Sequence, residues 1–333
     1  MRIGLAGAGR IGSYHAAALL RLPQTEALLI TDADPSRSLE VAGRLGATAV
    51  GSAGELLDSG IDALVVATAT AAHPSFILRG VAAGIPVFCE KPVAADVAGT
   101  LDVIKQTSGS AVPVHVGFQR RFDAGYAAAR AAVQSGSLGW VHTIRATTLD
   151  AAPPPPAYLP LSGGFFRDCA VHDFDAIRWV SGCEVTEAYA LGMNRGEPFF
   201  REAGDVDTLA VLLTLDDGTL ATVSGSRYNA AGYDVRLEVL GSAGCISTGL
   251  DDGLPMRSAE PGATFPAGPA YPDFTARFAA AYRAELADFV ALAADGGRSP
   301  CTMLDALEAL YIAEACELSR SRHEPVAVAE VRQ

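Results

Sequence analysis

The chain has 333 residues, half of them hydrophobic and 19% charged, so it is long enough for about two domains and can bury a large core. Its 25 Lys and Arg residues against 38 Asp and Glu residues give a formal net charge of −13. The sequence shows neither a clustered basic stretch nor an apolar run near the roughly 20 residues of a bilayer span. Nucleic acid and membrane are therefore excluded as partners.

The N-terminus and the cysteines favour a cytoplasmic protein. Met1 to Ala6 read as a β-strand, without the basic and apolar regions and the cleavage site of a secretory signal. The six cysteines form no C-x-x-C pair and fall in or near predicted strands and helices. We expect reduced thiols, no disulfide framework and no metal site.

Residues 1–118 alternate short apolar runs with helical stretches, which predicts an α/β domain with a doubly wound parallel sheet. The predicted strands are Arg2 to Ala6, Ala27 to Thr31, Thr48 to Val50, Ala63 to Ala67, Pro86 to Cys89 and Pro113 to Gly117. The predicted helices are Ile11 to Leu22, Pro35 to Leu45, Pro74 to Ala83 and Ala95 to Thr107.

Residues 119–333 predict an α+β domain on a largely antiparallel open sheet. Its expected helices are Ala124 to Ser135, Arg167 to Val180, Phe274 to Asp295 and Met303 to Ser321. Its expected strands are Trp140 to Leu149, Val185 to Met193, Thr208 to Leu215, Thr219 to Arg227, Val235 to Leu240 and Cys245 to Thr248. The segment from Ala151 to Pro160 contains five prolines and is expected to be a loop. Helices or another subunit could cover the open face of the sheet.

A glycine-rich loop, Gly7-Ala8-Gly9-Arg10-Ile11-Gly12, stands between the first strand and the first helix. In a G-x-G-x-x-G loop the first glycine permits the turn, the second lets the backbone approach a pyrophosphate, and the third lets helix and strand pack. Asp32 ends the second strand, where a carboxylate binds both adenine-ribose hydroxyls and repels a 2′-phosphate. The pattern predicts NAD rather than NADP.

Lys91 follows the fifth strand within Glu90-Lys91-Pro92. Ligands bind at the carboxyl ends of strands in such sheets, so an ammonium here is expected beside the nicotinamide, the alternative being an ordinary surface lysine.

A third motif runs from Gly163-Gly164 into the helix that carries Asp168, His172 and Asp175. At about 100° per residue these three side chains share one stripe, opposite an apolar face. An imidazole with a carboxylate one turn away suits a general base that takes a hydroxyl proton. A solvated helix face and a metal site on His172 and Asp168 are the alternatives.

Together these motifs resemble the Gfo/Idh/MocA oxidoreductases along essentially the whole chain. Within that family the segment Gly117 to Asp123 and the proline-rich loop before Gly163-Gly164 look most like inositol 2-dehydrogenases. The resemblance implies an NAD-dependent dehydrogenase that oxidises a secondary alcohol of a cyclic polyol, and a homotetramer formed through the second domains.

The resemblance also implies a set of site residues. It makes Lys91, Asp168 and His172 the catalytic group. It places the backbone of Ala67 and Thr68, with Glu90, near the cofactor, and it suggests substrate contacts at Gln119, Arg120, Asp150 and Tyr233. Gln119 stands where an inositol dehydrogenase is expected to have an apolar residue, which leaves the polyol open.

Other functions also remain open for this fold. The chain could be a dehydrogenase of a sugar or anhydrosugar, a hydrolase that uses NAD transiently to cleave glycosides, or a non-catalytic NAD sensor.

Overall fold

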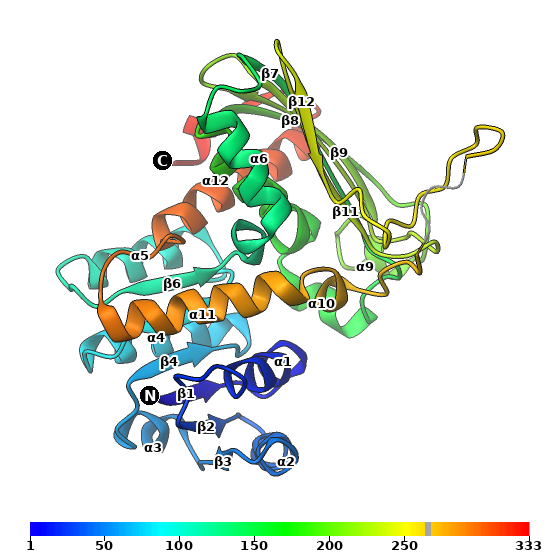
Figure 1. Ribbon diagram of the computed structural model, residues 1–333. Helices are drawn as coiled ribbons and strands as arrows, with labels where there is room; N and C mark the ends of the chain where they lie inside the picture. The colour runs from blue at the N-terminus through cyan, green and yellow to red at the C-terminus, as the bar shows by residue number, and fades with distance from the viewer. Residues whose placement is uncertain (264–267, 333) are drawn as a thin grey trace. The chain divides into compact units, whose positions relative to one another are not determined.

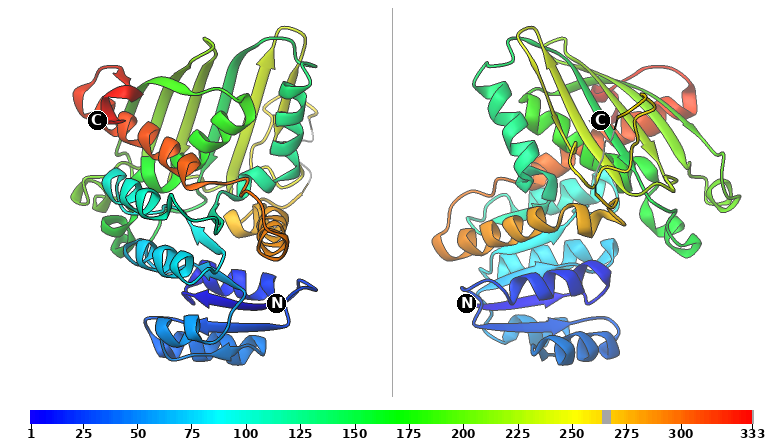
Figure 2. Two further views of the ribbon diagram at one scale, coloured as in Figure 1. Left: turned by 90° about the vertical axis from the view of Figure 1, so that its left-hand side faces the viewer. Right: turned by 45° about the vertical axis from the view of Figure 1, so that its right-hand side comes forward.

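The computed structural model describes residues 1–263 and 268–332, which form two compact units (Figures 1 and 2). Unit 1 comprises Met1–Gln119 and Ala280–Leu307, and unit 2 comprises Arg120–Ala279 and Glu308–Gln333. The expected domains, 1–118 and 119–333, differ from these units chiefly in the segment Ala280–Leu307, which returns to unit 1.

Unit 1 is built on a six-stranded parallel sheet in the order β3-β2-β1-β4-β5-β6. The strands are β1 (Arg2–Ala6), β2 (Ala27–Thr31), β3 (Thr48–Ala49), β4 (Ala63–Val66), β5 (Val87–Glu90) and β6 (Val114–Gly117). This order reverses between β1 and β4, and in a doubly wound sheet the crevice at that reversal is where a dinucleotide binds. The predicted parallel sheet is confirmed.

The helical segments before β6 comprise the four predicted helices and two short additions. They are α1 (Arg10–Leu19), α2 (Pro35–Leu45), α3 (Ala53–Asp58), η1 (Thr70–Ala72), α4 (His73–Ala82) and α5 (Val97–Thr107). Helix α3 was not predicted because its six residues are too few to show a period. Its signal is the cap, where Ser52 Oγ accepts a hydrogen bond of 3.1 Å from the Glu55 amide.

Helix α11 (Ala279–Asp295) joins the core of unit 1, although it lies about 160 residues beyond the sheet in sequence (Figure 1). Its fully buried residues Leu286, Phe289 and Val290 share one apolar cluster with residues of β1, β2, β4 and β5. The rings of Phe88 and Phe289 meet edge to face with centroids 5.7 Å apart. Burial of such side chains stabilises the fold by about 1.5–3 kcal/mol each, which explains why this helix returns to unit 1.

Unit 2 is built on a seven-stranded sheet in the order β12-β11-β7-β10-β9-β8-β13. The strands are β7 (Val141–Leu149), β8 (Val185–Met193), β9 (Thr208–Leu215), β10 (Leu220–Ser226), β11 (Asp234–Gly241), β12 (Cys245–Thr248) and β13 (Val326–Ala327). Every pair is antiparallel except β7 with β10, which run parallel. The prediction of a largely antiparallel sheet is confirmed.

The helical segments of unit 2 correct three predictions. They are η2 (Gln119–Phe122), α6 (Ala124–Gln134), η3 (Pro156–Tyr158), α7 (Leu159–Ser162), the π-helical turn η4 (Phe166–Ala170), α8 (Val171–Ser181), α9 (Phe199–Glu202), α10 (Phe274–Arg277), α12 (Met303–Arg322) and η5 (Val328–Arg332). The predicted loop over 151–160 ends in two short helical turns. The helix predicted over 167–180 begins as a π-turn, and that predicted over 274–295 is interrupted at Phe278.

One face of the unit 2 sheet carries helices α6 and α12 (Figure 1), and the other face exposes apolar side chains. Leu212 stands opposite Tyr189 of β8 and Thr222 of β10, so its side chain shares a face with those of Leu191 and Leu220. These leucines are 44–46% exposed. In the described ranges we find no helix that is both long and apolar enough to cross a membrane.

Candidate functional site

The glycine loop of unit 1 has the geometry that its spacing predicts. Gly7 has φ +98°, and a Cβ there would lie 2.3 Å from the Ala67 carbonyl oxygen. A Cβ on Gly12 would lie 1.9 Å from the Gly7 carbonyl oxygen, whereas a Cβ on Gly9 would meet nothing within 4 Å. The first and third glycines are thus required by close packing, and the backbone at Gly9 faces open space in which a pyrophosphate fits.

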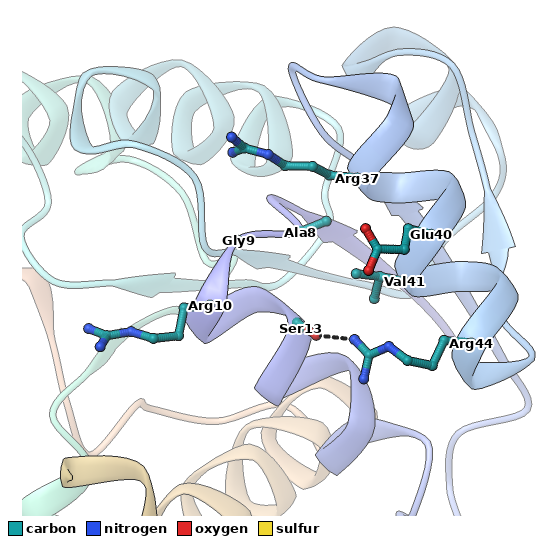
Figure 3. Close-up of a pocket in the computed structure, with 8 residues that line it drawn as sticks. All are labelled: Ala8, Gly9, Arg10, Ser13, Arg37, Glu40, Val41 and Arg44. Atoms are coloured by element: carbon teal, nitrogen blue, oxygen red, sulfur yellow. Dashed lines mark hydrogen bonds between the residues drawn. The ribbon is translucent and has the colours of Figure 1, made fainter.

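An open pocket of about 410 Å³ lies beside this loop (Figure 3). Its lining comes from α1 and α2 and the loop before α1, namely Ala8, Gly9, Arg10, Ser13, Arg37, Glu40, Val41 and Arg44. Arg44 donates a hydrogen bond of 2.6 Å to Ser13 Oγ across the pocket. Arg10 is exposed, whereas Ile11 packs against the core of unit 1. The guanidinium groups and the N-terminus of α1 favour an anionic ligand here.

The Asp32 carboxylate is fixed beside the glycine loop by two backbone amides. Its Oδ2 accepts a hydrogen bond of 2.6 Å from Ala8, and its Oδ1 accepts one of 2.8 Å from Asp34. A carboxylate oxygen has two lone pairs, so both oxygens can still accept from ribose hydroxyls. The carboxylate therefore lies at the end of β2, where the fingerprint requires it.

The ends of β4 and β5 carry the other predicted residues of unit 1. The amide of Ala67 donates to the Ala6 carbonyl at 2.8 Å, which aligns the ends of β1 and β4. His73, buried in α4, contacts the Thr68 carbonyl at 3.1 Å and the Pro92 carbonyl at 2.7 Å through its two ring nitrogens. It ties the loop after β4 to the loop after β5, which is a packing role.

Glu90 is the last residue of β5, and Lys91 follows it at the same edge of the sheet. Glu90 Oε1 lies 2.6 Å from Nε2 of His15, a fully buried residue of α1. Lys91 is half-buried, and Gln119, which ends unit 1, is 5% exposed. The structure thus gathers the predicted cofactor residues at the carboxyl ends of β1, β2, β4 and β5.

Two of the predicted residues of unit 2, Asp150 and Asp168, pair with a buried arginine that was not predicted. Arg227 Nη1 donates to Asp150 Oδ2 at 2.9 Å, and its Nη2 donates to Asp168 Oδ2 at 2.8 Å. Asp168 Oδ1 accepts a hydrogen bond of 2.9 Å from the hydroxyl of Tyr158, an exposed residue of η3. Both oxygens of Asp168 therefore have donors that stabilise its ionised form.

The neighbouring residues are also buried and polar. Arg120, 2% exposed, donates to Asp173 at 2.5 Å and to Thr148 Oγ1 at 3.0 Å. Burial acts to lower the pKa of Arg120, but the charged neighbours, chiefly Asp173, raise it by more than burial lowers it. The guanidinium therefore stays charged. Burial also raises the pKa of the Tyr233 hydroxyl and of the Cys169 thiol well above their usual ranges. Both groups are therefore neutral near neutral pH.

The prediction of a polar stripe on α8 is wrong at Asp175. This residue is fully buried, and its two carboxylate oxygens accept hydrogen bonds of 2.5 and 2.9 Å from Arg121. Helix α8 has buried residues on both of its faces, so it has no single solvent-exposed polar face of the kind that was expected. Asp168 and His172 are half-buried, whereas Asp175 is enclosed with an ion-pair partner 54 positions away in sequence.

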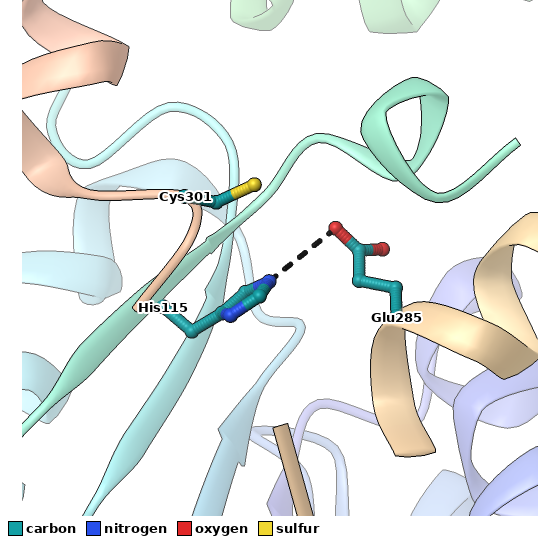
Figure 4. Close-up of side chains that lie close together, drawn as sticks. All are labelled: His115, Glu285 and Cys301. Atoms are coloured by element: carbon teal, nitrogen blue, oxygen red, sulfur yellow. Dashed lines mark ion pairs between the residues drawn. The ribbon is translucent and has the colours of Figure 1, made fainter. Parts of the chain in front are cut away.

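Two groups of described residues bring three potential metal ligands within 4.8 Å of one another, and neither contains a predicted site residue. Cys183, Asp216 and Asp217 lie at the surface. His115, Glu285 and Cys301 lie in the core of unit 1 (Figure 4), where His115 stacks on Phe88 as a core residue should. His115 Nε2 lies 3.7 Å from Glu285 Oε1, a contact that is an ion pair when the imidazole is protonated.

The residues that the sequence analysis missed all pair across long distances in the chain. Arg227 is 77 positions from Asp150 and 59 from Asp168. Thr148 and Asp173 also come from distant parts of the sequence, 28 and 53 positions from Arg120, to which both are hydrogen-bonded. The signal available in the sequence was the position of Asp150 and Arg227, each at the end of a predicted strand.

Comparison with known proteins agrees with this geometry. Residues 1–118 match an oxidoreductase family with an NAD-binding Rossmann fold, and residues 126–247 match the GFO/IDH/MocA C-terminal domain. Myo-inositol dehydrogenase Hyg17 of Streptomyces leeuwenhoekii is 39% identical over 96% of this chain and 97% of its own length. Inositol 2-dehydrogenase of Rhizobium meliloti is 33% identical over 99% of both chains.

A solved structure extends the comparison. Scyllo-inositol dehydrogenase from Lactobacillus casei, with bound NAD(H) and scyllo-inositol, superposes with a TM-score of 0.86, at 28% identity and over 99% of both chains.

Proposed function

This chain belongs to the GFO/IDH/MocA oxidoreductase family, and from that premise we propose that it oxidises a ring hydroxyl of an inositol-like cyclic polyol to a ketone. It is an NAD-dependent oxidoreductase acting on CH–OH groups. The observation that carries the choice of substrate is the cluster of Asp150, Asp168, Arg120 and Tyr233 in unit 2, because fixed carboxylates and neutral hydroxyls suit an uncharged, hydroxyl-rich ring.

The residues of unit 1 fit the cofactor. The open backbone at Gly9 and the N-terminus of α1 would hold the pyrophosphate, and Asp32 would accept hydrogen bonds from the adenine ribose. The backbone of Ala67 and Thr68, with Glu90, would line the cofactor further along the sheet edge. When bound, NAD supplies a nicotinamide ring that accepts a hydride.

Three side chains are proposed to handle the substrate hydroxyl. His172 accepts the hydroxyl proton as general base, and Lys91 of unit 1 holds the oxygen and stabilises the negative charge that develops on it. Asp168, whose carboxylate accepts hydrogen bonds from Arg227 and Tyr158, stabilises the protonated imidazole electrostatically.

Substrate contacts are proposed for Gln119, Arg120, Asp150 and Tyr233. Gln119 places an amide where an apolar residue was expected from the family resemblance, so we expect its donor and acceptor to select among the stereoisomers of the ring.

A panel of inositols, sugars and glycosides assayed with NAD tests this proposal. Production of NADH in equal amount to ketone from an inositol supports the dehydrogenase. Oxidation of sugars but not of inositols would indicate that the protein is a sugar dehydrogenase. Glycoside cleavage without net NADH would indicate a hydrolase, and NAD binding without any turnover would indicate a sensor.

The wild type is expected to prefer NAD to NADP by at least ~10-fold in kcat/KM, about 1.4 kcal/mol, because the fixed Asp32 carboxylate repels a 2′-phosphate. Replacing Asp32 with Ser and Ala33 with Arg should narrow this gap. Asp34→Ser is the control, since serine also caps α2 and should leave the ratio unchanged. Equal use of both cofactors by the wild type would remove Asp32 from its proposed role.

We further propose that the exposed face of the unit 2 sheet forms the contact of a homotetramer, because Leu191, Leu212 and Leu220 present an apolar surface there. Sedimentation should give a tetramer for the wild type and smaller species for Leu212→Glu. Leu39→Glu on α2, which alters an apolar residue that is more exposed than Leu212 and lies outside this sheet, should sediment like the wild type. A monomeric wild type at micromolar concentration contradicts the proposal.

The proposed location is the cytoplasm, since all six cysteines are free thiols.

A further inference from the structure

We propose that Arg227 is a positioning residue that holds the Asp150 and Asp168 carboxylates in the geometry used for substrate binding and proton transfer. The inference rests on the proposed function, because those two carboxylates are its proposed substrate contact and the partner of its general base.

The sheet register brings Arg227 and Asp150 together. Strands β7 and β10 run parallel and their last residues, Leu149 and Ser226, are paired. The residues that follow are Asp150 and Arg227, and the Asp150 amide donates to the Ser226 carbonyl at 2.8 Å. The Arg227 amide is fixed in turn by the Asp207 carbonyl at 2.7 Å. The backbone on both sides of the ion pair is thus anchored by the only parallel pair within the described strands of unit 2.

The guanidinium group links two separate elements. One of its nitrogens binds Asp150 at the end of β7, and another binds Asp168 in the π-turn η4. Its carbon lies 4.4 Å from the centroid of the buried Phe165 ring, so one face of the group is packed. Two carboxylates brought to one site repel each other, and the charge between them offsets that repulsion.

The geometry requires arginine rather than lysine. Arg227 is 4% exposed, and burial acts to lower its pKa, but the neighbouring Asp168 and Asp150 carboxylates raise it by more. A planar fork can donate in two directions while stacking on an aromatic ring. A lysine ammonium has neither the fork nor the stacking surface, so it cannot hold both carboxylates in the same positions.

Arg227→Lys and Arg227→Met test the inference through steady-state kinetics with the inositol that the wild type oxidises best. Both variants should raise KM and lower kcat, with kcat/KM falling by about 10²-fold, the typical cost of misplacing reacting groups by about 1 Å. The lysine variant keeps the charge, so it gives a result even if the methionine variant does not fold. Arg178→Met is the control. Arg178 is a buried arginine in the last turn of α8 and donates two hydrogen bonds of 2.6 Å to Glu184, which is not a proposed site residue. The Arg178→Met variant should have a lower Tm than the wild type and the same KM.

A double-mutant cycle distinguishes positioning from a structural role. If Arg227 acts through Asp150, then Arg227→Met should raise KM far less in the Asp150→Asn background than in the wild type. Additive effects on KM, or a variant that loses only thermal stability as Arg178→Met does, would overturn the inference. Full activity in Arg227→Lys would also overturn it.

A crystal structure of Arg227→Lys gives a readout that does not depend on the substrate. We expect the Asp150 or Asp168 side chain to move from its wild-type position, and unmoved carboxylates would contradict the role of Arg227. If the wild type oxidises no polyol, the proposed function is contradicted. The positions of the Asp150 and Asp168 carboxylates in the Arg227→Lys crystal structure would then still test whether Arg227 holds them in place.

Discussion

Replacing His172 with alanine is expected to lower kcat by roughly 10²- to 10⁴-fold and to leave NAD affinity nearly unchanged. The imidazole is proposed to take the hydroxyl proton, whereas the residues proposed to bind NAD lie in unit 1. Steady-state kinetics gives kcat, and isothermal titration gives the Kd for NAD.

His142→Ala is the matched control, because His142 is an exposed histidine of β7 and should keep wild-type turnover. If His172→Ala keeps near-wild-type turnover as well, His172 is not the base. Lys91 would then be the next candidate.

Replacing Lys91 with alanine is expected to lower kcat by a similar factor, about 10²- to 10³-fold, because a charge aimed at the reacting oxygen matters most when that oxygen becomes negative. Lys91→Arg should not restore activity, since the larger planar guanidinium cannot replace a compact ammonium. The chain contains two lysines, Lys91 and Lys105, among its 25 Lys and Arg residues.

Lys105→Ala provides the control for this prediction, because Lys105 is an exposed residue in the last turn of α5. It should match the wild type in kcat and KM. Wild-type kinetics in Lys91→Arg would show that only charge is needed at this position. Wild-type kinetics in Lys91→Ala would remove the residue from the mechanism.

Local patterns were sufficient to predict most of unit 1. Strands β1 and β2 and helix α2 match the predicted bounds, because alternation of apolar runs, Asp34 as a cap and Gly46 as a left-handed C-cap are all local signals. The three glycines have the conformations and clearances that their spacing requires. A fingerprint of this kind is readable from sequence because the ligand contacts come from consecutive residues.

The candidate site of unit 2 was less predictable because long-range pairing decides it. Periodicity put Asp175 beside Asp168 and His172, but Arg121 binds Asp175 inside the core. The link between Asp150 and Asp168 depends on the parallel register of β7 and β10, which no local pattern encodes. The return of α11 to unit 1 has the same origin, since its apolar residues indicate burial without indicating the partner.

The most direct test of the proposed reaction uses myo-inositol labelled with deuterium on the carbon that is oxidised, together with NAD and the wild-type protein. Transfer of hydride predicts that the deuterium appears in the reduced cofactor, in equal amount to the ketone formed, and that His172→Ala slows both together. Ketone formed without deuterium in the cofactor, or cofactor reduced without the label, would contradict hydride transfer from the polyol carbon and with it the function proposed for this chain.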